Sequence, residues 1–184
     1  MKRSCVFFDR DGTLMEDRNY LSDPDGVVLF PDTIPSLKKI AEAGFLMIIV
    51  SNQSGIGRGY FTEVELEKVN KRLEDLLAEG GVKLDAFYCC PHIDEDCCDC
   101  RKPKSGLILK ACEDFDIDLK SSYVVGDKIR DIMTGLNVGT NAILVTTGYG
   151  TNEVEKLPKG VPFVSNLSEV ADMICKKKIE VFCE

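Results

Sequence analysis

The sequence predicts an α/β fold, a doubly wound and mostly parallel sheet with helices on both faces. Short apolar runs alternate along the chain with segments of helical periodicity, as in βαβ units. One run, Phe45–Val50, contains no polar residue, which is typical of a central strand that is buried on both faces. Polar residues follow several of the runs, and the carboxyl ends of parallel strands form the ligand-binding edge of such sheets.

The predicted strands are short runs that are rich in apolar and β-branched residues. They cover Arg3–Phe8, Phe45–Val50, Leu84–Tyr88, Tyr123–Val125, Ala142–Val145 and Phe163–Val164. The predicted helices cover Thr33–Ala43, about 62–79, Leu107–Phe115, Ile129–Leu136 and Leu167–Lys176. Gly44 ends the first helix, and a capping box from Thr62 to Glu65 opens the second. With neither a repeat nor a linker, residues 1–184 are expected to form one domain.

Composition narrows the classes of partner. The net charge of −8 argues against a nucleic-acid partner, and no apolar run is long enough to span a membrane. The chain enters its first strand without the apolar segment of a secretory signal, so the expected location is the cytoplasm. We expect a monomer that acts on a small molecule. An anionic substrate would need a local group of basic side chains.

Two carboxylates leave the end of the first predicted strand. Asp9 and Asp11 follow the apolar run Cys5–Phe8, and Gly12 lets the chain turn sharply. Carboxylates this close repel each other, so the pair needs a cation or a shared proton. The arrangement suits one carboxylate as a nucleophile and the other as an acid and base, with a divalent metal between them.

Ser51 and Asp127 follow two further predicted strands, so the fold should bring both to the edge that carries Asp9. Asp9, Ser51, Lys102 and Asp127 each belong to a short motif. The four motifs resemble those of the haloacid dehalogenase superfamily of aspartate-nucleophile phosphatases, and they occur in the same order along the chain. The motifs are Phe8–Thr13, Ser51–Asn52, Arg101–Lys104 and Gly126–Asp127, the last followed by Asp131. The resemblance covers nearly the whole chain and implies a Rossmann-like fold.

The resemblance implies a role for each of these residues. Asp9 would attack phosphorus to form an aspartyl-phosphate, and Asp11 would protonate the leaving oxygen and then activate the hydrolytic water. Asp9, the backbone carbonyl of Asp11 and Asp127 would hold Mg²⁺, which prefers oxygen ligands. Ser51 would hydrogen-bond the phosphoryl oxygens, and Lys102 would neutralise the charge that grows on them.

Five of the nine cysteines and the only histidine lie within residues 89–100. The odd count and the absence of a secretory signal argue against a disulfide framework. Four of these residues form two pairs with a spacing of two, so each pair can present two ligands to one ion. The two pairs are Cys90 with His92 and Cys98 with Cys100. Together they predict a structural Zn²⁺ site. Cys89 and Cys97 are rival ligands, and a loop of reduced thiols without metal is the alternative.

The Cys/His segment of residues 89–100 leads directly to Lys102, and it indicates which group within the superfamily the chain resembles. Residues 98–103 (Cys-Asp-Cys-Arg-Lys-Pro), together with residues 9–13 and 51–59, resemble the heptose bisphosphate 7-phosphatases and the related histidinol-phosphate phosphatases. The single phosphatase domain and the residues after Gln53 favour the heptose group. The resemblance then implies Mg²⁺-dependent removal of the 7-phosphate from a D-glycero-D-manno-heptose 1,7-bisphosphate, a small phosphorylated sugar.

The stretches between the predicted strands are too short for a cap domain, so loops must select the substrate. The candidate substrate-binding residues are Asn52, Gln53, Arg58, Arg101 and Lys128. Asp131 is expected either behind the metal ligands or against Lys102. A receiver domain of a signalling protein, or a non-catalytic zinc-binding module, is the alternative from a different class. Asp11, two residues after Asp9, favours turnover over storage of the phosphoryl group.

Overall fold

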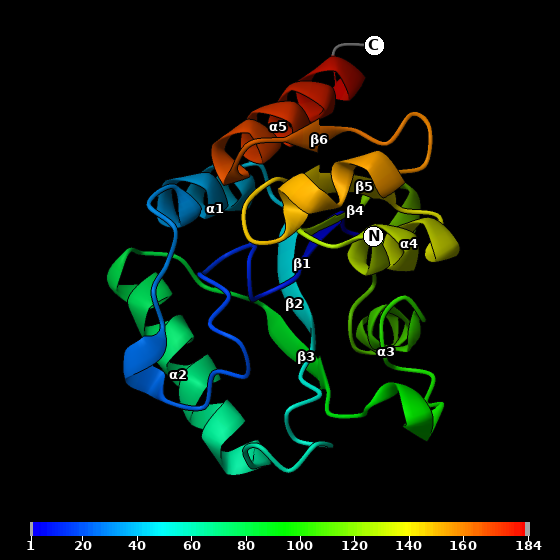
Figure 1. Ribbon diagram of the computed structural model, residues 1–184. Coiled ribbons are helices and arrows are strands. Elements are labelled where there is room, and N and C mark those ends of the chain that lie inside the picture. The colour runs from blue at the N-terminus through cyan, green and yellow to red at the C-terminus, as the bar shows by residue number, and fades with distance from the viewer. Residues whose placement is uncertain (1, 183–184) are drawn as a thin grey trace.

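The computed structural model describes residues 2–182, which form one parallel sheet of six strands (Figure 1). The strands are β1 (Cys5–Phe8), β2 (Leu46–Asn52), β3 (Ala86–Cys90), β4 (Tyr123–Gly126), β5 (Asn141–Val145) and β6 (Phe163–Val164). Their order in the sheet is β3-β2-β1-β4-β5-β6, so the direction of winding reverses between β1 and β4. Ligands of doubly wound sheets bind at this reversal. Met1, Cys183 and Glu184 of the predicted domain lie outside the described residues.

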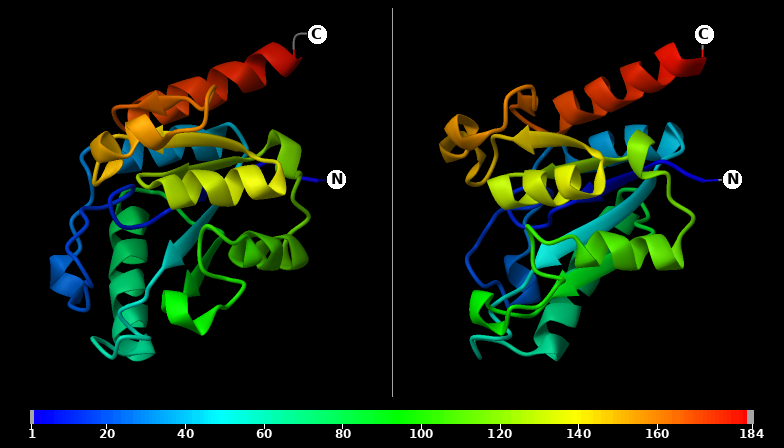
Figure 2. Two further views of the ribbon diagram at one scale, coloured as in Figure 1. Left: turned by 45° about the vertical axis from the view of Figure 1, so that its right-hand side comes forward. Right: turned by 90° about the vertical axis from the view of Figure 1, so that its right-hand side faces the viewer.

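Within residues 2–182, five α-helices cover the two faces of the sheet (Figure 2). One face packs against α1 (Thr33–Glu42), α2 (Glu63–Glu79) and α5 (Leu167–Phe182), and the other against α3 (Gly106–Asp114) and α4 (Ile129–Val138). Side chains of β1 alternate between the two apolar layers, with Val6 and Phe8 in one and Cys5 and Phe7 in the other. Because both faces are covered, the central strands carry apolar residues throughout.

All the predicted strands and helices form, but some bounds differ. β3 begins two residues later than predicted and runs to Cys90, so Cys89 and Cys90 belong to the sheet and not to the following loop. Parallel pairing explains the shift, because β2 continues to Asn52 and pairs Ser51 with Cys89 and Asn52 with Cys90. The Cys/His segment therefore starts on the sheet, directly beside Ser51.

Several connections between these elements contain turns of 3-10 helix, such as Pro24–Gly26 after β1 and Asp94–Asp96 after β3. Among the described residues, no segment forms a separate cap over the carboxyl edge of the sheet. That edge is therefore covered only by loops. The part of the chain that the structure describes also has no helix that is both long and apolar enough to cross a membrane.

Candidate active site

Strands β1 and β4 deliver two carboxylates to the point where the winding reverses. Asp9 follows β1 and its backbone N–H donates to the carbonyl of Val125 in β4, at 2.9 Å. Asp127 follows β4. Gly12 lies against it with φ of +85°, and a Cβ at this position would stand 2.3 Å from Oδ2 of Asp127. Only glycine fits where the chain turns past this carboxylate.

A cation is expected at this point because three buried carboxylates converge there. Oxygen atoms of Asp9, Asp127 and Asp131 all lie within 4.8 Å of one another. Oδ2 of Asp127 accepts a hydrogen bond from the backbone N–H of Tyr149. Its buried Oδ1 accepts no hydrogen bond from residues 2–176, and the ammonium group of Lys128 lies 3.5 Å from it. Burial raises the pKa of Asp127 to about 7, and the charge of Asp9 adds to the rise. This donor set of oxygens fits Mg²⁺.

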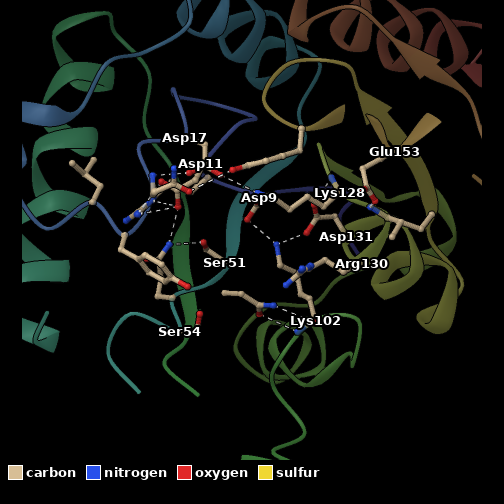
Figure 3. Close-up of a pocket in the computed structure, with 18 of the residues that line it drawn as sticks. Asp9, Asp11, Asp17, Ser51, Ser54, Lys102, Lys128, Arg130, Asp131 and Glu153 are labelled. Atoms are coloured by element: carbon tan, nitrogen blue, oxygen red, sulfur yellow. Dashed lines mark hydrogen bonds and ion pairs between the residues drawn. The ribbon is translucent and has the colours of Figure 1, made fainter. Parts of the chain in front are cut away.

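The ammonium group of Lys102 lies between two of these carboxylates (Figure 3). Its Nζ is 2.7 Å from Oδ1 of Asp9 and 2.6 Å from Oδ1 of Asp131. Burial lowers the pKa of Lys102, but the charges of Asp131 and Asp9 outweigh this effect and raise it. For Asp9 the two effects have the opposite signs. Burial alone would raise the pKa of Asp9, but the positive charge of Lys102 outweighs burial, so the pKa of Asp9 is lowered. Lys102 is therefore a fixed positive charge, and Asp131 is placed against it.

Asn52, predicted to contact substrate, holds the backbone of Lys102. Its Oδ1 accepts from the N–H of Lys102 at 3.0 Å, and its Nδ2 donates to the carbonyl of Lys102 at 3.1 Å. Asn52 is the last residue of β2, so these two hydrogen bonds join the central sheet to the end of the Cys/His segment. Asn52 also lines the cavity described below, but the observed hydrogen bonds of its amide are to the backbone of Lys102.

Asp11 is held from two sides. The Nε2 of Gln53 donates to Oδ2 of Asp11 at 2.9 Å and to Oγ of Ser51 at 2.8 Å. Arg10 donates to both carboxylate oxygens of Asp11, at 3.1 Å each, and its Nη1 donates to Asn70 at 2.7 Å. Arg10 is fully buried. Sequence reasoning missed Arg10, because an arginine between two carboxylates in a turn is typical of a solvated position. The only signal in the sequence for the contact between Arg10 and Asp11 is that the two residues are adjacent.

A cavity of about 520 Å³ opens above these side chains. Asp9, Asp11, Ser51 and Lys102 all line it. Several other lining residues come from the loop after β1, the start of α4 and the segment after β5, and sequence reasoning missed them. They include Asp17, Tyr20, Arg130, Tyr149, Glu153 and Lys156. No motif marks these positions, and only the fold brings them together.

The basic residues predicted to bind substrate have different positions. Lys128 lines the cavity, with its Nζ 3.1 Å from Asp17. Arg58 and Arg101 are not among the residues that line it. The guanidinium of Arg101 is buried and lies 2.6 Å from a carboxylate oxygen of Asp94. Its placement indicates that Arg101 stabilises the Cys/His segment, which does not support the predicted contact with substrate.

The four predicted zinc ligands come together where β3 ends. The ligand atoms of Cys90, His92, Cys98 and Cys100 all lie within 4.8 Å of one another. The three sulfur–sulfur distances are 3.1, 3.5 and 3.7 Å. A tetrahedral site with Zn–S bonds of about 2.3 Å would separate its sulfurs by about 3.8 Å, so the cluster nearly has the required size. The rivals lie apart, because Cys89 contacts Asn70 and Cys97 is exposed.

Comparison with known proteins agrees with this geometry. A model of the HAD-hydrolase-like family matches residues 99–170. The probable D-glycero-D-manno-heptose-1,7-bisphosphate 7-phosphatase of Thermoplasma volcanium is 46% identical over 123 residues, which are 67% of this chain and 84% of the relative. The D-glycero-β-D-manno-heptose-1,7-bisphosphate 7-phosphatase of Pasteurella multocida is 38% identical over 178 residues, which are 93% of this chain and 95% of the relative. The chain belongs to the heptose-1,7-bisphosphate 7-phosphatase family.

Solved structures of this family share the fold. The D,D-heptose 1,7-bisphosphate phosphatase of B. bronchiseptica, complexed with magnesium and phosphate, superposes with a TM-score of 0.89 at 29% identity. The match covers 95% of this chain and 99% of that one. A second phosphatase of the same name, from Burkholderia thailandensis, gives a TM-score of 0.71 at 29% identity, over 93% and 97% of the two chains. The predicted haloacid dehalogenase fold is confirmed, and the receiver-domain alternative is set aside.

Proposed function

We propose that this chain is a Mg²⁺-dependent phosphatase that removes the 7-phosphate from D-glycero-D-manno-heptose 1,7-bisphosphate. The main support is the pair Asp9 and Asp11 at the reversal of the sheet, in a chain 38% identical over 93% of its length to a curated enzyme of that name. The names of several relatives specify the β anomer, so we take the β anomer as the substrate. No observation favours histidinol phosphate over it.

Asp9 is the proposed nucleophile. Its Oδ1 accepts a hydrogen bond from Lys102, which leaves Oδ2 to attack phosphorus. The bond between phosphorus and the sugar oxygen breaks as the aspartyl-phosphate forms, and Asp11 gives its proton to the leaving oxygen. Gln53 and Arg10 orient Asp11 for this transfer through the hydrogen bonds described above.

Hydrolysis of the aspartyl-phosphate completes the proposed cycle. Asp11, now a carboxylate, takes a proton from water as the water oxygen attacks phosphorus, and Asp9 is released together with inorganic phosphate. The hydroxyl of Ser51 and the ammonium of Lys102 lie where they can stabilise the phosphoryl oxygens in both steps.

Both metals of the proposal have matching donors in this chain. Asp9, the backbone carbonyl of Asp11 and Asp127 would hold Mg²⁺, and a related solved phosphatase contains magnesium and phosphate. When bound, Mg²⁺ supplies positive charge that offsets the carboxylates and the phosphoryl oxygens. Zn²⁺ would be structural and would fix the loop that ends at Lys102. Its proposed ligands are Cys90, His92, Cys98 and Cys100.

The proposed domain organisation, oligomeric state and location are those expected from the sequence. One domain over residues 1–184, with a zinc loop at about 89–102, would act as a monomer in the cytoplasm on a small phosphorylated sugar. Asn52 and Arg101 would support the loop, and Gln53 would orient Asp11. Lys128, on the wall of the cavity, keeps its proposed contact with substrate.

A substrate panel tests this function. Phosphate release would be measured with Mg²⁺ for both anomers of the heptose bisphosphate, histidinol phosphate and fructose 1,6-bisphosphate. The proposal predicts the highest kcat/KM for the β heptose bisphosphate. A higher kcat/KM for histidinol phosphate would assign the chain to the related phosphatases.

A further inference from the structure

Most basic side chains that line the active-site cavity already form an ion pair with a carboxylate of this chain, and one does not. The basic lining residues are Arg10, Lys102, Lys128, Arg130 and Lys156. Four of the five form ion pairs: Arg10 with Asp11, Lys102 with Asp9 and Asp131, Lys128 with Asp17 and Asp127, and Lys156 with Glu153. Among residues 2–176, whose side chains the structure describes, Arg130 alone of this set has no ion pair.

Arg130 occupies the first turn of α4, beside the reversal of the sheet. Two backbone N–H groups at this end of the helix already have acceptors, because Lys128 donates to Asp131 and Ile129 donates to Glu153. The side chain of Arg130 is exposed. In Figure 3 Arg130 lies with Asp131 and Glu153 on one side of Asp9, opposite Asp11 and Ser54. An anion that enters on the α4 side would therefore meet this guanidinium.

A sugar bisphosphate brings two anionic groups into one cavity. The second pKa of a phosphate ester is about 6, so each group is largely doubly charged at neutral pH. One group reacts at Asp9, and the other keeps its charge throughout the reaction. Of the other predicted substrate-binding cations, Arg58 and Arg101 do not line the cavity, and Asp94 occupies the guanidinium of Arg101. Lys128 lines the cavity but is paired with Asp17 and Asp127. A guanidinium without an ion pair can form two parallel hydrogen bonds to such a phosphate.

We propose that Arg130 binds the phosphate group that is not transferred and thereby determines the preference for a bisphosphate over a monophosphate. This inference rests on the proposed function and names a specificity residue for the same site. The energy of the contact would hold the reacting phosphate in line with Asp9, so that both binding and turnover of the bisphosphate depend on it.

Two substrates with the same leaving group test this role. The substrates are D-glycero-D-manno-heptose 1,7-bisphosphate and the corresponding heptose 7-phosphate, which differ only in the phosphate that is not transferred. Wild-type protein, Arg130→Gln and Arg130→Lys would be compared by kcat/KM for phosphate release with Mg²⁺. Arg72→Gln is the matched control, because it removes the same charge from an exposed position on α2.

The expected result is a loss of about tenfold or more in kcat/KM for Arg130→Gln on the bisphosphate, and a loss at least five times smaller on the 7-phosphate. Arg130→Lys should recover part of the loss, because it restores the charge but not the planar pair of donors. Arg72→Gln should resemble wild type on both substrates.

Equal losses for Arg130→Gln on the two substrates, or no loss on the bisphosphate, would overturn the inference while leaving the proposed function in place. The proposed function fails separately, if wild-type protein releases phosphate from other esters but not from the heptose bisphosphate. The inference would then fall with it.

Discussion

The ammonium group of Lys102 lies 2.7 Å from Oδ1 of Asp9, although 93 residues separate the two in sequence. Asp9 directly follows β1, whereas Lys102 ends the Cys/His segment, so this contact joins the segment to the carboxyl edge of the sheet. Asn52 fixes the backbone of Lys102 from β2. The position of the ammonium group therefore depends on the fold of the Cys/His segment as much as on the sheet.

Replacement of the proposed nucleophile should stop the reaction without unfolding the chain. Asp9→Asn is expected to reduce phosphate release by about 10³-fold or more, because a carboxamide does not form the aspartyl-phosphate. The measurement is the steady-state release of phosphate, with circular dichroism to confirm the fold. Asp75→Asn, on the exposed face of α2, is the control and should keep wild-type activity. A rate for Asp9→Asn within about tenfold of wild type would rule out this mechanism.

Loss of a zinc ligand should lower stability and activity together. Cys98→Ser removes one of four clustered ligand atoms, so the segment that ends at Lys102 should lose its fixed shape. Elemental analysis is expected to find about one zinc per wild-type chain and less in Cys98→Ser, with a lower Tm and lower kcat. Cys97→Ser, at the exposed neighbouring position, should match wild type. Protein purified without chelators that contains no zinc would contradict the assignment.

Removal of the amide that orients Asp11 should affect turnover more than binding. Gln53→Ala deletes the hydrogen bonds to Asp11 and Ser51, and we expect kcat to fall by about tenfold or more with little change in KM. Steady-state kinetics on the heptose bisphosphate measure both constants. A rise in KM at unchanged kcat would instead make Gln53 a substrate contact, as the sequence predicted.

The carboxylates of the site could be predicted because strand ends are easy to locate in this sequence. Asp9 and Asp127 each follow an apolar run, and parallel strands place such residues at one edge. The clustering of Cys90, His92, Cys98 and Cys100 could be predicted from their spacing, which the extended chain at Cys90 and the following loop preserve. Local patterns were sufficient in both cases.

The remaining contacts depend on tertiary structure that no local pattern encodes. Arg10 is buried because α2 provides Asn70 as a partner, 60 residues away in sequence. Arg101 follows the clustered Cys100 and resembles a substrate contact in sequence, but its guanidinium pairs with Asp94 of the same segment. Arg130 carries no motif, and only the packing of α4 places it in the cavity.

The pH dependence of metal binding follows from the environment of Asp127. Burial and the charge of Asp9 raise its pKa from 3.8 to about 7 in the metal-free fold. Because the folded state then binds this proton more tightly than the unfolded state, the free energy of unfolding without metal should fall as the pH rises from about 4 to about 7. Mg²⁺ displaces the proton, so it should raise Tm more at about pH 8 than at about pH 5.5.

Thermal unfolding with and without Mg²⁺ at the two pH values measures this effect. Asp127→Asn removes both the ligand and the titrating group, so its Tm should respond weakly to Mg²⁺ at either pH. Equal Mg²⁺-induced shifts in Tm at the two pH values for wild-type protein would contradict the assignment of Asp127 as a metal ligand.

Phosphorus NMR of the reaction tests the central claim most directly. With D-glycero-β-D-manno-heptose 1,7-bisphosphate, Mg²⁺ and wild-type protein, the resonance of the 7-phosphate should disappear as that of inorganic phosphate grows, while the resonance of the 1-phosphate persists. The same mixture with Asp9→Asn should remain unchanged. Loss of the 1-phosphate first, or loss of both phosphates at similar rates, would contradict the account.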